Sequence, residues 1–271
     1  MPLDVIFIGA YSLTTFGGGV KWFINLLNLL QIDGRIRPHL FVQDNVDHER
    51  AKRHDIKKMV NFDYQEIRHS SGQLLPQNFP STGIDTVYTM TDRPQILQKA
   101  KELGASRVIF GAHDPYLLLL KGKKRRLFEE EWRHVTAIHI LSPAQVAFSR
   151  YNSNLFPLPN TWFGRRIPRP KKFSKFTVLF FSRHEEDKGF DIVERVARTL
   201  PEDIDLYIVG SGTTSTRITR VRTSSVHVLG FIRETELYSI LERSHGVLFP
   251  SRRESGLSMV AVEALAHHTP L

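Results

Sequence analysis

The sequence predicts an α/β protein with two domains, each built on a parallel β-sheet. Short apolar runs alternate with amphipathic stretches along most of the 271 residues. One proline-rich, basic stretch interrupts this alternation, and the same pattern then starts again. Regular alternation of strands and helices favours parallel strands with helices on both faces, as in Rossmann-like domains. A chain of this length corresponds to one large or two ordinary domains.

The composition is that of a globular protein with an excess of positive charge. Hydrophobic residues make up 41% and charged residues 24%, close to the globular averages of about 45–50% and 25%. No apolar run approaches the ~20 residues of a membrane span, and residues 1–4 lack the basic flank of a signal peptide. We therefore expect a cytoplasmic protein. The net charge of +9 favours an anionic partner such as a nucleotide or an anionic lipid surface. The absence of cysteine excludes disulfides and cysteine nucleophiles.

The first half of the chain contains five apolar runs that predict buried strands. These runs cover residues 4–9, 38–42, 85–89, 107–110 and 136–141. A helix is predicted to begin at the three glycines 17–19, because apolar residues follow at helical spacing from Val20 to Leu30. A polar stripe of Lys21, Asn25 and Asn28 accompanies them. Further helices are predicted over residues 94–103 and 143–151, and residues 44–59 predict a loop and a helix.

The second half repeats the pattern after residues 157–175, which hold four prolines and many basic residues. We interpret that stretch as the linker and place the domains at 1–160 and 176–271, with the basic linker at 161–175. Strands are predicted over 176–181, 206–210, 226–230 and 246–250, and helices over 191–200 and 234–243. A last helix is expected to carry Leu257, Val260, Ala261, Ala264 and Leu265 on one face.

Three segments that follow predicted strands contain residues suited to binding a nucleotide. Glycines 17–19 let the backbone approach a phosphate at a helix amino terminus. Alone this signal is weak, and the alternative is a flexible turn. Arg183 and Lys188 follow the first strand of the second domain, where two cations can converge on a diphosphate and stabilise it as a leaving group. The alternative is a solvated charged loop. Glu254 and Glu263 follow the last strand, and a carboxylate there can accept hydrogen bonds from a ribose diol. For Glu254 the alternative is a carboxylate favoured by a helix amino terminus.

Taken in order, these segments resemble the GT4-like family of retaining glycosyltransferases, which have the GT-B fold. The resemblance covers most of the chain and is most specific from Phe176 onward. The family's motifs occur here as Gly17-Gly18-Gly19, Gly111-Ala112-His113-Asp114, Pro159-Asn160, Arg183 to Lys188-Gly189, Val209-Gly210-Ser211-Gly212 and Pro250-Ser251, Glu254, Glu263-Ala264.

The resemblance implies transfer of a sugar from a UDP- or GDP-linked nucleotide-diphosphate sugar, with retention of configuration and without a cofactor or metal. The acceptor expected is a lipid-linked molecule or a polysaccharide. The implied catalytic residues are His113, Arg183, Lys188 and Glu254. The implied donor-binding residues are Gly17, Gly18, Gly19, Gly210, Gly212, Gly230, Ser255, Gly256, Leu257 and Glu263. Without the resemblance, His113 is equally explained as a packed histidine at a strand end.

The sequence departs from the family pattern in two places. One residue more than usual separates Glu254 from Glu263, which turns a helix position by about 100°. Either the loop absorbs this residue or Ser255 takes the place of the first glutamate. The second domain is also expected to be incomplete, because the chain ends at Leu271, where the family continues into another strand. A homodimer or a partner chain covering this shortened domain is then expected.

A second basic cluster bears on the acceptor. It consists of Lys121, Lys123, Lys124, Arg125 and Arg126 and follows the apolar residues 117–120. Such a cluster suits peripheral binding to an anionic membrane and a lipid-linked acceptor; an ordinary solvated helix face explains it equally well. The other functional hypotheses are a degenerate protein that binds a nucleotide sugar or a partner without turnover and, third, glycosylation of nucleic acid or protein.

Overall fold

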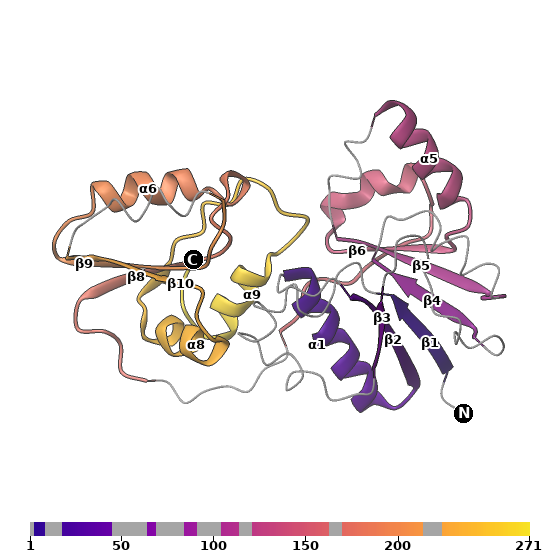
Figure 1. Cartoon of the computed structure of the whole chain (residues 1–271), viewed down its shortest axis with the longest axis horizontal. Helices are drawn as coiled ribbons and strands as arrows, with labels where there is room; N and C mark the ends of the chain where they lie inside the picture. The colour runs from indigo at the N-terminus through magenta and orange to yellow at the C-terminus, as the bar shows by residue number, and fades with distance from the viewer. Residues whose placement is uncertain are drawn as a thin grey trace. The chain divides into compact units, whose positions relative to one another are not determined.

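The computed structural model describes residues 3–8, 18–44, 64–68, 84–90, 104–113, 121–162, 170–213 and 224–271. Its contacts divide the chain into two compact units. Unit 1 comprises Met1–Phe163 with Ser255–Leu257, and unit 2 comprises Gly164–Glu254 with Ser258–Leu271. Each unit has its own parallel sheet and its own helices (Figure 1), so the predicted α/β fold class is confirmed.

Unit 1 is built on a parallel sheet with the strand order β3-β2-β1-β4-β5-β6-β7 in the described ranges. The strands are β1 (Leu3–Ile8), β2 (Ile36–Asp44), β3 (Tyr64–Arg68), β4 (Thr86–Thr89), β5 (Arg107–Ala112), β6 (Ala137–Ile140) and β7 (Leu155–Pro157). The helices are α1 (Gly18–Asp33), α5 (Gly122–Trp132) and the 3-10 helix η2 (Pro143–Arg150).

The five strands predicted in this half are confirmed, and the structure adds elements that the apolar pattern does not predict. Strand β3 is short and mostly polar, and β7 has only three residues. Pro157, predicted to begin the linker stretch, closes β7 instead. The predicted helix at 143–151 is present as the 3-10 helix η2. The elements predicted over 45–59 and 94–103 lie outside the described residues.

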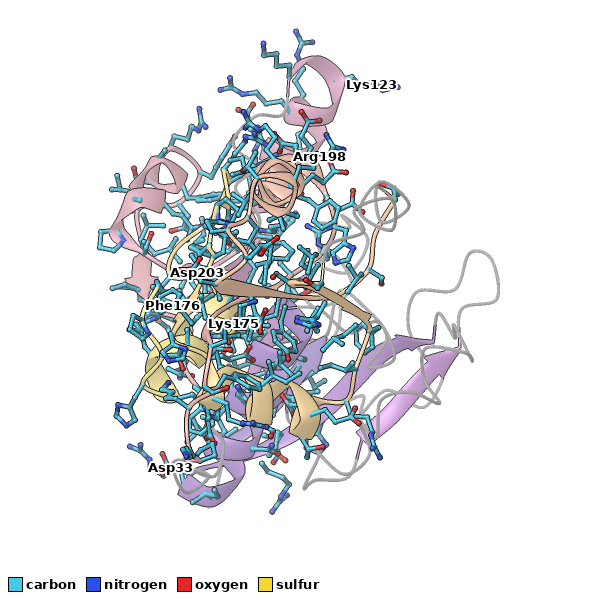
Figure 2. All side chains as sticks on the ribbon, turned by 90° about the vertical axis from the view of Figure 1, so that its left-hand side faces the viewer. Asp33, Lys123, Lys175, Phe176, Arg198 and Asp203 are labelled. Carbon is cyan, nitrogen blue, oxygen red and sulfur yellow. The ribbon has the colours of Figure 1, made fainter. Side chains whose placement is uncertain are left out.

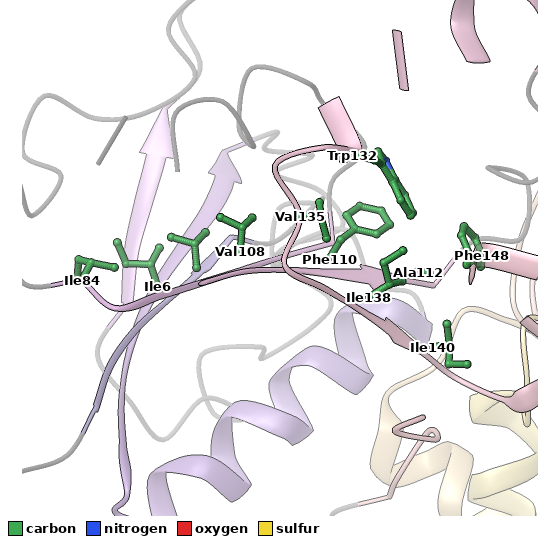
Figure 3. Close-up of a cluster of buried hydrophobic side chains, with 11 residues drawn as sticks. Ile6, Ile84, Val108, Phe110, Ala112, Trp132, Val135, Ile138, Ile140 and Phe148 are labelled. Carbon is green, nitrogen blue, oxygen red and sulfur yellow. The ribbon is translucent and has the colours of Figure 1, made fainter. Parts of the chain in front are cut away.

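The two faces of the unit 1 sheet carry different side chains. On one face, Val108, Phe110 and Ile138 pack with Trp132 of α5 and Phe148 of η2 in the cluster drawn in Figure 3. The other face packs against α1 through aromatic rings. Phe7 of β1 lies 5.9 Å from Phe23 of α1, centroid to centroid, and 5.6 Å from Tyr88 of β4. Alternate side chains of one strand point to opposite faces, which explains this division.

The polar stripe of α1 is buried. Lys21, Asn25 and Asn28 are 4–6% exposed, although their alternation with apolar residues is typical of a surface helix. The Asn25 amide donates a hydrogen bond to the Thr161 carbonyl at 3.3 Å. The helix is therefore embedded on its polar side too, and the buried amide is satisfied by backbone.

Unit 2 contains a smaller parallel sheet with the order β10-β9-β8-β11 among the residues described. The strands are β8 (Phe176–Phe181), β9 (Ile204–Val209), β10 (Val226–Gly230) and β11 (Gly246–Val247). The helices are the 3-10 helix η3 (Glu186–Lys188), α6 (Phe190–Arg198), α8 (Glu234–Arg243) and α9 (Met259–Ala266). Every strand and helix predicted for this half is present, with β11 shorter than predicted.

Helices cover both faces of the unit 2 sheet. Phe180 of β8 packs with Phe190 and Val193 of α6, whereas Leu179 and its neighbours pack with Leu241 of α8 and with α9. Figure 1 shows α6 on one side of β8 and β9, with α8 and α9 on the other. This three-layer arrangement is the Rossmann-like form that the alternation predicts.

One prediction about the last helix is wrong. Ser258 caps its amino terminus by accepting a hydrogen bond from the Ala261 amide at 3.1 Å, so Leu257 precedes the helix. Leu257 and Leu265 are 48% and 54% exposed, whereas Ala261 and Ala264 are buried. The helix faces the sheet with small residues, and the large leucines lie off that face. Within the described ranges, no helix is long and apolar enough to cross a bilayer.

Candidate functional site

The strand order of unit 2 marks one end of its sheet as a place for a ligand. The first strand, β8, lies between β9 and β11. From β8 the chain moves to β9 and then β10 on one side, and it crosses back to β11 on the other side, so the strand order reverses between β8 and β11. Open α/β sheets bind ligands at the carboxyl ends of strands at such a point. The loops that leave β8 and β11 contain Arg183, Lys188 and Glu254. The three predicted catalytic residues of unit 2 thus lie on the two loops that flank this point.

The loop after β8 reverses quickly into helix α6. Gly189 has a left-handed backbone, with φ of 71°, and is the residue before α6. A side chain there would collide with the carbonyl oxygen of Pro250, in the loop after β11. Glycine is therefore required here for two reasons: the backbone is left-handed, and the neighbouring loop leaves no room for a side chain.

The two loops are also joined by hydrogen bonds. The Arg252 amide donates to the Asp187 carbonyl at 2.9 Å. The Arg252 guanidinium forms two parallel bonds to the Asp191 carboxylate, at 2.5 and 2.7 Å. These bonds hold the pKa of Asp191 down at about 2. A forked arginine–carboxylate pair fixes orientation as well as distance, so the loop after β11 is tied to the start of α6.

Lys188 and Glu254 meet between these loops. The Lys188 Nζ lies 2.7 Å from Glu254 Oε1, and the same oxygen accepts a hydrogen bond from Ser251 Oγ at 2.6 Å. The two side chains are 18% and 25% exposed. Glu254 is not in the first turn of α9, which begins at Met259, so the helix-terminus interpretation of this glutamate is wrong. Its position is set by Lys188 and Ser251.

Arg183 lies on the same loop but is more exposed. Its guanidinium is 3.2 Å from Asp187 Oδ2, and the two side chains are 64% and 42% exposed. An exposed ion pair of this kind contributes little to stability. The guanidinium is therefore available to exchange Asp187 for another anion at small cost.

The glycine turn after β9 packs closely against the loop after β8. Gly210 has φ of 124°, and a side chain there would collide with the Ser182 carbonyl oxygen. A side chain on Gly212 would lie 2.5 Å from the His184 carbonyl oxygen. The backbone of the turn is joined to that loop by a hydrogen bond from the His184 amide to the Ser211 carbonyl, at 3.0 Å. The glycines thus let the two strand-end loops touch backbone to backbone.

The remaining predicted residues of unit 2 lie further along the chain. Gly230 ends β10 with φ of 65°, and its carbonyl accepts a hydrogen bond from the Gly210 amide at 2.7 Å. Glu263 lies within α9 and is 5% exposed. The Tyr238 hydroxyl lies 3.4 Å from Glu263 Oε1 and 2.6 Å from Glu234 Oε1. The predicted ribose contact of Glu263 stays a prediction.

Unit 1 contains its own predicted residues. Gly17 lies outside the described residues, whereas Gly18 and Gly19 form the first turn of α1. A side chain on Gly19 would lie 3.5 Å from the Met90 methyl group, just after β4. Since β1 lies between β2 and β4, this helix start also follows the first strand at the point where the strand order diverges.

His113 follows β5 directly and is surrounded by aromatic rings. Trp22 lies 4.3 Å and His139 lies 5.2 Å from its ring, centroid to centroid. Its Nε2 is 3.4 Å from the Tyr88 hydroxyl, which is itself 2.8 Å from His139 Nδ1. Burial lowers the pKa of His113 well below its ordinary value, and the nearby His139 lowers it further. His113 is therefore a neutral imidazole, packed among aromatic rings and polar groups at the end of β5.

The motifs in the sequence do not point to Tyr88 and His139. Both lie in runs correctly predicted as strands, and both are buried, with 5% and 0% exposure. A tyrosine and a histidine inside buried strands require polar partners. This requirement could have marked Tyr88 and His139 as members of a polar cluster, but it does not identify the residues that they contact.

The residues Ser255–Leu257 group with unit 1. Ser255 Oγ donates to the His113 carbonyl at 2.6 Å, and the Leu257 carbonyl accepts from the Asn160 amide at 2.7 Å. A side chain on Gly256 would lie 3.1 Å from the Leu141 carbonyl oxygen. Ser255 thus contacts the backbone carbonyl of His113. Ser255 and Glu254 are the two candidates for the place of the first glutamate in the family motif.

The basic clusters are only partly described. Lys121, Lys123, Arg125 and Arg126 are exposed at the start of α5, where Arg125 pairs with Glu129 at 2.7 Å. The side chain of Lys124 lies outside the described set, as do Arg165, Arg166 and Arg169 of the linker.

Comparisons with known proteins agree with this fold. Residues 175–271 match the family model described as "Glycosyl transferases group 1". No curated protein sequence matches the chain. Among solved structures, HepE from Anabaena in complex with UDP-glucose is 17% identical, with a TM-score of 0.74, covering 99% of this chain and 79% of that one.

Two other solved structures share the fold. A mutant of TarM from S. aureus, in complex with fondaparinux, alpha-GlcNAc-glycerol and UDP, is 13% identical, with a TM-score of 0.69 and coverage of 98% and 84%. The lipopolysaccharide outer core galactosyltransferase WaaB is also 13% identical, with a TM-score of 0.65 and coverage of 99% and 79%.

The fold and the family match agree with each other. The chain has the two Rossmann-like units of GT-B proteins, and its carboxyl-terminal part carries the group 1 glycosyl transferase domain. The predicted resemblance to GT-B glycosyltransferases is therefore confirmed in the fold of the whole chain and in the family match of residues 175–271.

Proposed function

We propose that this protein transfers a sugar from a UDP- or GDP-linked nucleotide-diphosphate sugar to an acceptor hydroxyl, with retention of configuration. The observation that carries the proposal is the meeting of the loops after β8 and β11, where Arg183, Lys188 and Glu254 gather at the diverging point of the unit 2 sheet. HepE and TarM, which share the fold, were solved in complexes that contain UDP-glucose or UDP, and this supports a nucleotide-linked donor.

In this proposal, unit 2 binds the donor and unit 1 serves the acceptor side. Arg183 and Lys188 bind the diphosphate and stabilise the negative charge that develops as the bond from the anomeric carbon to the phosphate oxygen breaks. The new bond from the anomeric carbon to the acceptor oxygen forms on the same face of the sugar, and the proton of the acceptor hydroxyl passes to the departing phosphate oxygen. Since two side-chain cations supply the charge stabilisation, we propose that no cofactor or metal is required.

The remaining predicted residues take the roles that the resemblance implies. Glu263 holds the ribose, the Gly230 region lines the base, and Glu254 faces the donor sugar. His113 contacts the donor sugar near the reacting carbon. Glycines 17–19 approach the diphosphate. Each of these roles is part of the proposal.

A lipid-linked or polysaccharide acceptor is the finer part of the proposal. The exposed cations of α5 and the preceding Lys121 would hold the protein at an anionic membrane surface, at about 1 kcal/mol per charge. WaaB acts on lipopolysaccharide by its printed description, which supports a lipid-linked acceptor. The same helix carries Glu129 and Glu130, so its surface is mixed and not purely basic.

A degenerate protein that binds a nucleotide sugar without turnover is the second candidate. The observation that favours it is the ion pair between Lys188 and Glu254. In this pair the Lys188 ammonium, which the transferase needs for the diphosphate, is already bound to a carboxylate. Turnover separates the two functions, since both predict binding. Glycosylation of nucleic acid or protein remains the third candidate, supported only by the net charge of +9.

The decisive experiment is thermal melting of the protein with UDP, GDP, ADP and their sugars. A ligand at 100 times its dissociation constant adds roughly 2.7 kcal/mol to the free energy of unfolding. We expect a shift with one nucleotide and its sugars, and loss of this shift in the variant Arg183→Ala/Lys188→Ala.

A matched control removes two cations from the other end of α6. Arg195 and Arg198 lie in its last turn, and Figure 2 labels Arg198. The variant Arg195→Ala/Arg198→Ala should keep the full shift. The proposal fails if a folded protein responds to no nucleotide, or if both variants lose the shift equally. Release of free nucleoside diphosphate from a bound nucleotide sugar then tests turnover.

A further inference from the structure

A buried chain of polar contacts crosses the face of the unit 1 sheet that packs against α1. It runs from His113 Nε2 to the Tyr88 hydroxyl at 3.4 Å, and from there to His139 Nδ1 at 2.8 Å. It ends at the Leu158 carbonyl oxygen, 2.7 Å from His139 Nε2. These residues come from β4, β6 and the segments directly after β5 and β7, so the chain of contacts links neighbouring strands of the sheet.

The direction of every hydrogen bond follows from the carbonyl at its end. A carbonyl oxygen only accepts, so His139 donates from Nε2 and carries its proton there. Burial lowers the pKa of His139 to about 4, so the ring is neutral at pH 7 and its Nδ1 is an acceptor. The Tyr88 hydroxyl must then donate to Nδ1 of His139. Its oxygen retains lone pairs, and these face Nε2 of His113.

The tautomer of His113 follows in the same way. Tyr88 has one proton, and that proton is engaged with His139. Burial raises the pKa of Tyr88 well above its ordinary value, so the hydroxyl keeps this proton. A proton on Nε2 of His113 gives a hydrogen bond to the hydroxyl oxygen, whereas a bare Nε2 would face oxygen lone pairs. The network therefore favours a proton on Nε2 and leaves the lone pair of His113 on Nδ1.

The backbone makes room for this arrangement. A side chain on Gly111 would collide with the Tyr88 hydroxyl and would lie 3.2 Å from Cδ2 of His113. The indole of Trp22 closes the same cluster, stacking at 5.0 Å and 21° on His139. Glycine at this position of β5 is what allows the tyrosine hydroxyl to lie beneath the strand end that carries His113.

We propose that Tyr88 and His139 are positioning residues that hold His113 as its Nε2-protonated tautomer, so that its Nδ1 lone pair meets a hydroxyl group of the substrate. This rests on the proposed function for the statement that the hydroxyl belongs to a sugar. A lone pair accepts a hydrogen bond from a hydroxyl and repels a carboxylate at the same place. The arrangement selects a sugar with a hydroxyl group there, in preference to one with a carboxylate.

Nitrogen NMR of protein labelled with ¹⁵N-histidine tests the tautomer without any substrate. Protonated and bare imidazole nitrogens give well-separated signals, and the variants His113→Gln and His139→Gln assign the two residues among the 12 histidines. We expect Nδ1 of both residues to be bare and Nε2 of both to be protonated at pH 7. A protonated Nδ1 on His113 overturns the proposal.

The variant Tyr88→Phe removes one oxygen and keeps the ring. We expect it to shift the Nε2 signal of His113 and the Nδ1 signal of His139, and Gly111→Ala to do the same by displacing the phenol. The matched control is Tyr207→Phe in β9 of unit 2, where the ring stacks on Phe173 at 5.3 Å, and it should leave both signals in place. Unchanged signals in Tyr88→Phe overturn the positioning role.

Turnover gives the second measurement. With a nucleotide sugar that the protein uses, Tyr88→Phe should lower kcat at least tenfold with little change in KM for the nucleotide sugar, while Tyr207→Phe keeps both. Equal turnover in the two variants overturns the proposal even if the NMR signals move. If the unaltered protein turns over no sugar although both histidines have the expected tautomers, the proposed function fails. The positioning of His113 by Tyr88 and His139 then still stands.

Discussion

Lys188 and Glu254 are bound to each other, with 2.7 Å between Nζ and Oε1, although 66 positions separate them in the sequence. They lie on loops that leave two neighbouring parallel strands, β8 and β11. The lysine charge is therefore partly balanced before any ligand arrives. A diphosphate that binds Lys188 competes with this carboxylate, and the competition makes the pair informative to mutate.

Lys188→Met is expected to weaken binding of the preferred nucleoside diphosphate by tenfold or more. A hydrogen bond to a charged group contributes about 1.5–3 kcal/mol, and methionine keeps the length of the side chain without its charge. Isothermal titration calorimetry measures the change. The companion variant Glu254→Gln removes the competing charge and should bind the nucleotide as tightly or more tightly. A large loss of affinity in both variants would mean that the pair only holds the loops together.

Gly189→Ala is expected to destabilise unit 2 and to separate its two loops. The left-handed backbone at this position costs a residue with a side chain about 1–2 kcal/mol, and the collision with the Pro250 carbonyl adds to this. Urea denaturation should show a loss of more than ~2 kcal/mol in the free energy of unfolding. Nucleotide affinity should fall as well.

Gly230→Ala provides the control for this prediction. Gly230 also has a left-handed backbone, with φ of 65°, but among the described residues no neighbouring atom lies within 4 Å of the added methyl group. Its loss should therefore be limited to the backbone strain of about 1–2 kcal/mol. Equal losses in the two variants would show that the contact between Gly189 and Pro250 contributes nothing.

The stability of the protein should fall between about pH 6.5 and pH 4. Burial lowers the pKa of His139 and of His184 to about 4, while an unfolded histidine titrates near 6.5. Below pH 6.5 the unfolded chain binds protons that the folded chain does not, so the free energy of unfolding decreases as the pH falls. Each histidine contributes at most about 1.4 kcal/mol per pH unit in this window.

His139→Gln isolates one part of that dependence. Denaturation at pH 7, 6, 5 and 4.5 should give a flatter curve for the variant than for the unaltered protein. Carboxylates with lowered pKa values, such as Asp191 at about 2, lose their contribution only at lower pH and are common to both proteins. Parallel curves would contradict a neutral, buried His139.

Neutralising Lys123 and Arg126 is expected to weaken binding to anionic vesicles. Both are exposed on α5, and about 1 kcal/mol per charge predicts a loss of about tenfold to thirtyfold for Lys123→Gln/Arg126→Gln. Sedimentation with vesicles of phosphatidylglycerol and phosphatidylcholine measures it, with Arg195→Gln/Arg198→Gln as the control of equal charge. If the two variants bind alike, the α5 cations belong to an ordinary solvated helix surface.

The order of strands and helices could be predicted because burial requires apolar residues at strand or helix spacing in the local sequence. An apolar run at residues 176–181 predicts β8. The charged residues and glycines that follow such runs indicate which loops bind a ligand. Strand β3, which is mostly polar, and strand β7, which has only three residues, were missed. The exposure of Leu257 and Leu265 was also missed, because Ser258 starts α9 later than the apolar spacing suggests.

The sequence alone determined the class of fold, the resemblance and the set of strand-end residues, because each depends on residues close together in the chain. Only the tertiary structure decided that Glu254 pairs with Lys188, and that His113 meets Tyr88 and His139. Those contacts join segments 25 or more positions apart. They depend on the order of strands in each sheet, and local spacing carries no information about that order.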